Sequence, residues 1–155
     1  MEKLLILILT FSASWAWVRE MENDGLYQGD MVLNPEQMQT LKHGVFGFGA
    51  TTDKLWPTTI AYEYSDEIAA SPKAVAAIQA AIKDYHHYTC LRFVERTNEE
   101  NFLHFYKGGG CSSPVGMNGG ANRISLAEGC WARGTTIHEI AHSLGKLTYF
   151  IHPKC

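Results

Sequence analysis

The stretch Thr136-Ile137-His138-Glu139-Ile140-Ala141-His142-Ser143-Leu144-Gly145 decides how the rest of this 155-residue chain is interpreted. On a helix, His138 and His142 lie four residues apart and project from one face, so both imidazoles can reach one metal ion. Glu139 follows the first histidine, where its carboxylate can take a proton from a water that the metal activates. This H-E-x-x-H pattern predicts a zinc site with its own general base.

The residues around the pattern favour a metal site over a chance match on a surface helix. Ile137, Ile140 and Leu144 are apolar, which indicates that the helix is partly buried. Gly145 follows at the position where a helix can end in a left-handed turn. A buried helix of this kind is typical of zinc metallopeptidases.

Composition and charge narrow the class of protein. Hydrophobic residues make up 46% of the chain and charged residues 19%, values that are ordinary for one globular domain plus processed segments. The net charge is −3. Because no basic run and no aromatic-basic interleaving occurs, nothing indicates nucleic-acid binding.

The N-terminus predicts export. Lys3 precedes an apolar run at residues 4–9, and small residues follow at Ser14 and Ala16. This order predicts a secretory signal peptide at residues 1–16. The apolar run is too short to span a bilayer, so we expect a secreted, extracellular protein without a membrane anchor.

Export places the four cysteines, Cys90, Cys111, Cys130 and Cys155, in an oxidising compartment. No C-x-x-C pair is present to suggest a cysteine zinc site, so disulfides are the better interpretation. Four cysteines allow three pairings, and the sequence pattern alone leaves the choice open.

The order of predicted strands and helices predicts an α+β fold with a mixed sheet and helices packed on it. Scattered acidic residues and glycines at residues 17–49 are poorly suited to a core and indicate a pro-region with a linker, the alternative being a mobile N-terminal arm. The expected strands are residues 59–64, 90–95, 102–106 and 122–126, and the expected helices are residues 73–88 and 134–144.

Several ordered elements resemble the astacin family of secreted zinc endopeptidases, within the metzincins. Besides the zinc helix, they are residues 88–93, 110–116, 119–120, 124–126 and 129–135. The resemblance implies that residues 50–155 form the N-terminal subdomain of a metzincin catalytic domain, a mixed, mostly parallel twisted sheet with two long helices. It also implies protein or peptide substrates and one zinc ion per chain. It assigns His138 and His142 as zinc ligands and Glu139 as the catalytic general base.

The same resemblance implies three further roles. Cys111 and Cys130 match a disulfide that braces the sheet beside the zinc helix, and residues 122–126 match the edge strand along which peptide substrates lie. Tyr27-Gln28-Gly29-Asp30 resembles the aromatic-x-Gly-Asp element of astacin pro-segments. It implies that Asp30 acts as a latency switch by placing its carboxylate on the zinc, and that activation cuts near residues 49–50.

The chain departs from the family after Gly145. Metzincins place a third histidine six residues after the second, and that position is Thr148, whose hydroxyl is a poor zinc ligand. No acidic residue follows Glu139, and His152 is a weak substitute because nothing presets the turn that it needs. The second subdomain of the family is absent from this sequence, which therefore resembles a C-terminally truncated member.

The truncation leaves three interpretations. The first is a secreted zinc metalloendopeptidase precursor whose 155-residue form binds zinc weakly and cleaves negligibly. The second is a catalytically inactive pseudo-protease or peptide-binding module, and the third is a fragment from a truncated transcript. The sequence assigns no oligomeric state.

Overall fold

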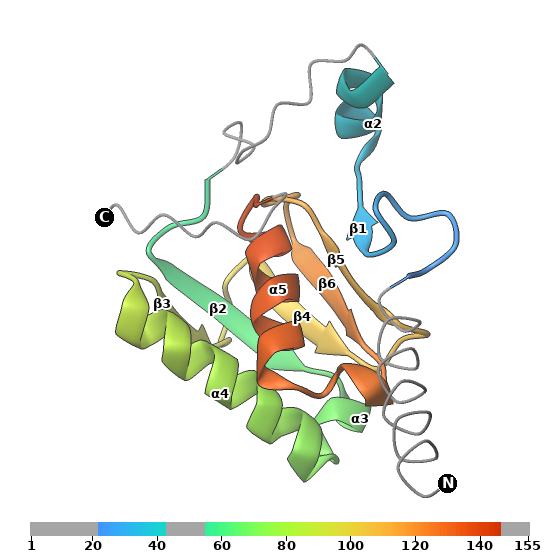
Figure 1. Ribbon diagram of the computed structural model, residues 1–155. Helices are drawn as coiled ribbons and strands as arrows, with labels where there is room; N and C mark the ends of the chain where they lie inside the picture. The colour runs from blue at the N-terminus through green and yellow to red at the C-terminus, as the bar shows by residue number, and fades with distance from the viewer. Residues whose placement is uncertain (1–21, 43–54, 147–155) are drawn as a thin grey trace, which may run out of the picture.

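The computed structural model describes residues 22–42 and 55–146, which are built around one mixed sheet (Figure 1). The predicted signal peptide at residues 1–16 lies outside the described residues, as do Thr148 and His152. Within the described ranges, no helix has the length and apolar character needed to cross a bilayer.

A six-stranded sheet forms one layer of the molecule. Its strands are β1 (Met31–Val32), β2 (Thr59–Tyr64), β3 (Arg92–Glu95), β4 (Phe102–Tyr106), β5 (Cys111–Pro114) and β6 (Ala121–Leu126). They lie in the order β1-β5-β6-β4-β2-β3, and every neighbouring pair is parallel except β5 with β6. The predicted α+β class with a mixed, mostly parallel sheet is confirmed.

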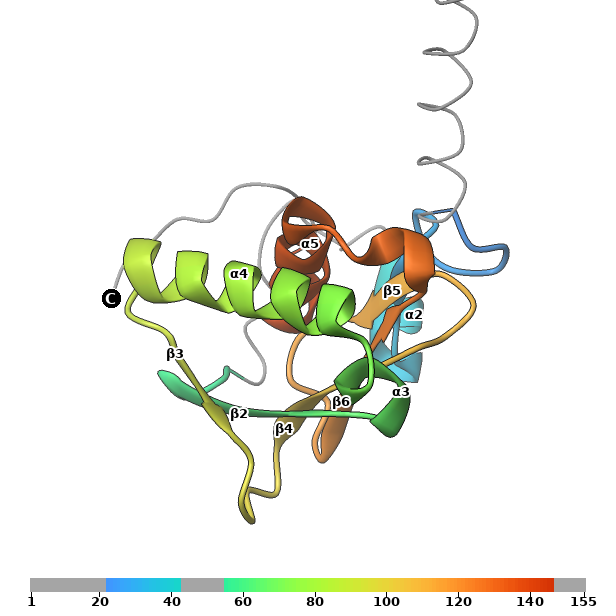
Figure 2. The same ribbon diagram turned by 90° about the horizontal axis from the view of Figure 1, so that it is seen from below.

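The predicted helices are α4 (Pro72–Tyr88) and α5 (Arg133–Ser143), which cover one face of the sheet (Figure 2). Ser71 begins α4 because its hydroxyl accepts a hydrogen bond from the Ala74 amide, and Pro72 suits the first helical position. Three shorter elements complete the set: α2 (Pro35–Lys42), α3 (Asp66–Ala69) and the 3-10 helix η1 (Glu128–Cys130).

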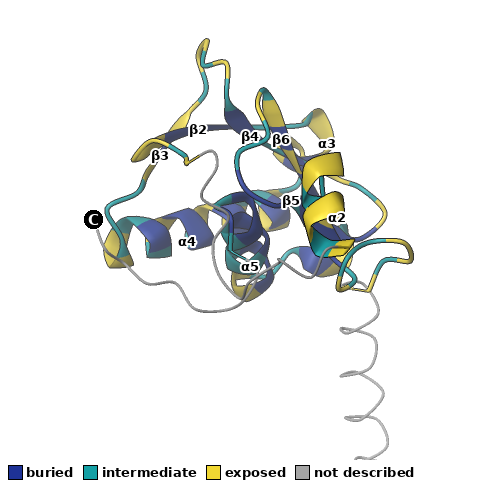
Figure 3. Ribbon diagram, turned by 90° about the horizontal axis from the view of Figure 1, so that it is seen from above, coloured by how far each residue is buried: buried dark blue, intermediate teal, exposed yellow. Residues whose placement is uncertain are grey.

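The core lies between the sheet and the two long helices, where the dark blue segments of Figure 3 face each other. Leu103 and Phe105 of β4 and Ile124 of β6 are completely buried, and so is Ile140 of α5. Burying each large apolar side chain stabilises the fold by about 1.5–3 kcal/mol. This packing holds α5, with its histidines, against the sheet.

The prediction that residues 122–126 form an edge strand is wrong. β6, which contains the predicted residues 122–126, lies inside the sheet between β5 and β4. β5 turns back antiparallel to β6 and lies between β6 and the outermost strand β1, although Cys111-Ser112-Ser113-Pro114 has little strand propensity of its own. Burial of Ser113 and Cys111 shows that packing, more than propensity, makes this strand.

The N-terminal segment contributes more to the fold than its composition predicts. β1 pairs in parallel with β5, in the register Met31 with Ser113 and Val32 with Pro114. Met31 is 1% exposed, while α2 has no buried residue. Part of the predicted pro-region at residues 17–49 therefore adds a strand to the sheet, and α2 extends away from it (Figure 1).

A disulfide joins Cys111 of β5 to Cys130 of η1, the pair that the resemblance implied. The two cysteines are 19 positions apart in the chain, and their bond ties β5 to the turn that leads into α5. The chain-entropy model gives the loop that this bond closes roughly 3 kcal/mol of stabilisation. Cys90 is also disulfide-bonded, and Cys155, for which the sequence predicts no particular partner, lies outside the described residues.

We expect Tyr85→Phe to lower the free energy of unfolding by about 1 kcal/mol. The buried Tyr85 hydroxyl donates a 2.9 Å hydrogen bond to the Ile137 carbonyl, which joins α4 to α5. Urea unfolding followed by circular dichroism measures the change. Tyr88→Phe is the matched control, because Tyr88 is on the same helix and 69% exposed. An equal loss in both variants would contradict a specific link between the helices.

Candidate metal centre

Helix α5 brings the two motif histidines together. The rings of His138 and His142 are one helical turn apart, with centroids 4.4 Å apart and planes nearly perpendicular. Their Nε2 atoms lie 2.9 Å from each other, so both rings direct a nitrogen at the same point. Two converging imidazole nitrogens are the arrangement that a transition-metal ion requires.

The end of α5 fixes the tautomer of His142. Gly145 adopts a φ of +91°, and the amide of Lys146 bonds back to the Ala141 carbonyl, which is a Schellman turn. This turn brings the Lys146 carbonyl within 2.7 Å of His142 Nδ1. Since a carbonyl only accepts, Nδ1 carries the hydrogen, and Nε2 is the nitrogen that can bind a metal ion.

Asp30 completes a group of three donors. Its Oδ2 lies 2.7 Å from His138 Nε2 and 3.6 Å from His142 Nε2, and the candidate ligand atoms all lie within 4.8 Å of one another. Burial raises the pKa of Asp30, but the hydrogen bonds and charges of the two histidines outweigh burial and lower the pKa to about 2. Asp30 is therefore an ionised carboxylate facing both imidazoles.

The turn before β1 aims Asp30 at the histidines. Gln28 and Gly29 both have positive φ, +51° and +89°, and Gln28 is the one residue other than glycine with a positive φ in the described ranges. The Gly29 carbonyl accepts bonds from the amide of Asn23 and from its side chain, which close the loop. The sequence Gln28-Gly29-Asp30 thus has a specific backbone shape that places a carboxylate at its end.

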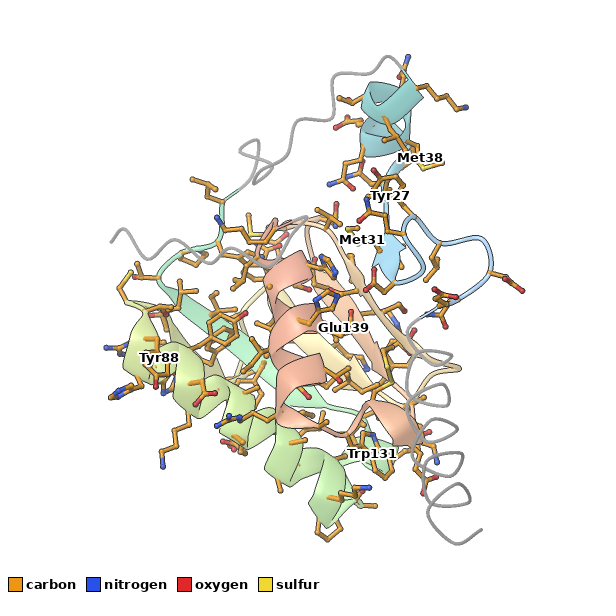
Figure 4. All side chains as sticks on the ribbon, viewed as in Figure 1. Tyr27, Met31, Met38, Tyr88, Trp131 and Glu139 are labelled. Atoms are coloured by element: carbon orange, nitrogen blue, oxygen red, sulfur yellow. A yellow bond between two sulfur atoms is a disulfide. The ribbon has the colours of Figure 1, made fainter. Side chains whose placement is uncertain are left out.

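Glu139 is fully buried beside this group. Neither of its carboxyl oxygens has a hydrogen-bond partner among the described residues. Burial, and secondarily the charge of Asp30, raises the pKa of Glu139 to about 9. A buried carboxyl group without a partner is costly. A hydrogen-bond donor such as a water molecule held next to the imidazoles would satisfy these oxygens. Figure 4 shows Glu139 on α5 and Met31 on the neighbouring segment.

Polar contacts from Trp56, Ser113 and Gly116 hold the end of α5. The Trp56 indole donates to the Ser143 carbonyl at 2.8 Å, and the Gly116 amide donates to the His142 carbonyl at 2.9 Å. The hydroxyls of Ser113 and Ser143 share a buried 2.8 Å hydrogen bond. Sequence reasoning did not find these supports, because small polar residues far apart in the chain carry no local signal.

The residues present fit a zinc ion. Two imidazole nitrogens and one carboxylate oxygen form the donor set, and the partnerless Glu139 carboxyl lies beside them within the described part of the chain. The structure brings together the predicted Asp30, His138, Glu139 and His142, while the alternative donor His152 is outside the described residues. Such a donor set on an α+β scaffold is typical of zinc metalloproteases.

Comparisons with known proteins agree on the family. The sequence matches the model of the Astacin peptidase family over residues 49–152. It is 34% identical over 128 residues to Zinc metalloproteinase nas-6 of Caenorhabditis elegans (81% of this chain, 37% of that protein). It is 38% identical over 130 residues to Zinc metalloproteinase nas-8 of Steinernema carpocapsae (82% and 31%). The chain belongs to the astacin family of zinc metalloproteases.

A solved structure supports the same assignment. High choriolytic enzyme 1, a hatching enzyme zinc-protease from Oryzias latipes, is similar with a TM-score of 0.57 and 34% sequence identity. The similarity covers 62% of this chain and 52% of that one. The present chain spans about a third of the length of the two curated relatives.

We expect Asp30→Ala to weaken zinc binding by at least about tenfold, because losing even an outer-shell partner of a metal ligand costs roughly 10–100-fold. Competition with a chromophoric chelator measures the affinity on the purified chain. Asp24→Ala is the control, since Asp24 is exposed in the same segment. Equal affinity in Asp30→Ala and the parent chain would remove Asp30 from the ligand set. A loss in His152→Ala instead would assign the third ligand to His152.

Proposed function

We propose that this chain is a secreted, latent precursor of a zinc metalloendopeptidase, with Glu139 as the general base of peptide hydrolysis. The observation that carries the proposal is the buried carboxyl group of Glu139, without a partner among the described residues, next to two converging imidazoles. Such a group has no evident structural role, because its burial is costly. Membership in the astacin family supports the same chemistry.

His138 and His142 would hold the zinc ion, which supplies Lewis-acid activation of water and of the scissile carbonyl. Glu139 accepts the proton of the attacking water and passes it to the leaving amine. With Asp30 beside it, burial raises the pKa of Glu139 to about 9 and keeps the carboxyl group protonated at neutral pH. Removal of the Asp30 charge and the positive charge of a zinc ion would both lower this pKa and leave Glu139 able to take a proton. The hydrogen bond of His142 to Lys146 keeps that ring in the ligating tautomer.

Latency is the proposed role of Asp30. The ionised carboxylate occupies the open side of the histidine pair, where an attacking water would otherwise bind. The segment that carries it also pairs with β5 and covers that edge of the sheet. We propose that residues 17–49 are the pro-region, that residues 1–16 are the signal peptide, and that cleavage near residues 49–50 frees both the histidine pair and the edge.

Protein or peptide substrates are proposed to bind along β5. The edge accepts an added strand, since the Ser113 amide donates to the Asp30 carbonyl and the Val115 amide to the Val32 carbonyl. Once the N-terminal segment leaves, those amides are free to bind an extended peptide. A peptide bound to these amides would have its backbone beside the histidines.

A non-catalytic module is the second candidate. The same edge could bind a peptide without cleaving it, and Thr148 stands where metzincins have their third histidine. The peptidase proposal requires a third ligand other than Asp30, whereas the binding proposal does not.

Thr148→His combined with Asp30→Ala should give zinc-dependent cleavage of an unstructured peptide, while the parent chain should cleave negligibly. Adding Glu139→Gln should lower the rate by about 10²–10⁴-fold, the usual contribution of a general base. Mass spectrometry of the products measures cleavage, and zinc content is checked in each variant. A zinc-loaded double variant that binds the peptide and leaves it intact would favour the non-catalytic module.

A further inference from the structure

The N-terminal segment is held by more than its strand pairing. β1 has only two residues, and its flanking hydrogen bonds are those from the Ser113 amide (2.9 Å) and the Val115 amide (3.3 Å). Since α2 has no buried residue, apolar packing does not fix the part of the segment that follows β1. The polar side chains at the start of α2 are therefore the groups that can hold this part of the segment to the domain.

Asn34 and Gln37 form a reciprocal cap at the start of α2. The Asn34 side-chain oxygen accepts from the Gln37 amide, and the Gln37 side-chain oxygen accepts from the Asn34 amide, both at 2.9 Å. This is the geometry of a capping box. It uses the oxygen of each side-chain amide and leaves both NH₂ groups to bind something else.

Both NH₂ groups point to the same loop of the domain. Asn34 Nδ2 donates to Asn118 Oδ1 at 2.7 Å, and Gln37 Nε2 donates to the Val115 carbonyl at 2.9 Å. Each side chain thus caps α2 with one atom and binds the domain with the other. Neither contact involves Asp30 or the histidines.

The receiving loop is firmly connected to the candidate metal centre. The Gly116 amide donates to the His142 carbonyl, and the Gly116 carbonyl accepts from the buried Asn122 side chain at 2.7 Å. Asn118 Nδ2 lies within 3.2–3.3 Å of the Val115 and Gly116 carbonyls, so its oxygen is the atom presented to Asn34. The loop therefore presents two hydrogen-bond acceptors, the Val115 carbonyl and Asn118 Oδ1, to the N-terminal segment.

We propose that Val115 and Asn118 form a docking surface for side-chain amides, and that Asn34 and Gln37 bind it as a second anchor of the N-terminal segment, independent of the metal. The inference deepens the proposed function, because the segment is the proposed pro-region. Asp30 is held in place from both sides: by the Asn23 loop before it and by this anchor after it.

Gln37→Glu tests the anchor and leaves the helix intact. Glutamate keeps the oxygen that caps Asn34 and suits a helix N-terminus, but it cannot donate to the Val115 carbonyl. Hydrogen exchange of the Ser113 and Val115 amides in the full chain, with chelator present, reports opening of β1. Exchange should become roughly fivefold faster for one lost bond, and faster still with Asn34→Asp.

Gln39→Glu is the matched control, because Gln39 is exposed on the same helix and its substitution makes the same change in charge. Rates are expressed relative to the buried Ile124 amide of β6, so a general loss of stability cancels. Unchanged rates in Gln37→Glu, or an equal rise in Gln39→Glu, would overturn the anchor. Because no zinc or substrate is needed, a chain that cleaves nothing still gives the answer.

Discussion

The rest of the molecule depends on the convergence of two imidazole nitrogens at one point. His138 and His142 meet only because α5 is a straight helix through both, and because Gly145 ends it in a turn that gives His142 a carbonyl partner. The turn therefore selects the tautomer as well as the chain direction. Packing of Ile140 into the core and the polar contacts at Ser143 hold that helix against the sheet.

The polar groups buried at this centre explain why its support is so extensive. Glu139 has no hydrogen-bond partner among the described residues, and Asp30 is 6% exposed with an ionised carboxylate. Each would be unfavourable in an ordinary core. They persist because the surrounding structure is stable enough to keep them buried. Buried ionisable groups with shifted pKa values are common at functional sites. The disulfide at Cys111 adds to that stability on the same side of the sheet.

Local sequence was sufficient for the elements with strong periodicity and insufficient for the short polar ones. The strands at residues 59–64 and 102–106 were predicted with their observed bounds, since β-branched and aromatic residues fill them. β1 and β5 were not predicted, because two-residue and serine-rich strands exist only through their pairing. Misplacing the edge of the sheet followed from that omission. The H-E-x-x-H motif predicted that His138, Glu139 and His142 lie on one helix, whereas Asp30 was proposed from the resemblance of residues 27–30. Its approach to the histidines rests on a turn that composition does not show.

The N-terminal segment acts as one bound unit whose contacts support one another. Asp30, β1 and the Asn34–Gln37 cap follow one another within eight residues, so binding of any one holds the others close to their partners. Losing one contact weakens the segment and does not release it at once. Release requires that several contacts open together. A segment held in this way keeps the Asp30 carboxylate next to the histidines through contacts that do not involve a metal ion, so the position of the segment and the binding of a metal are separable properties of this fold.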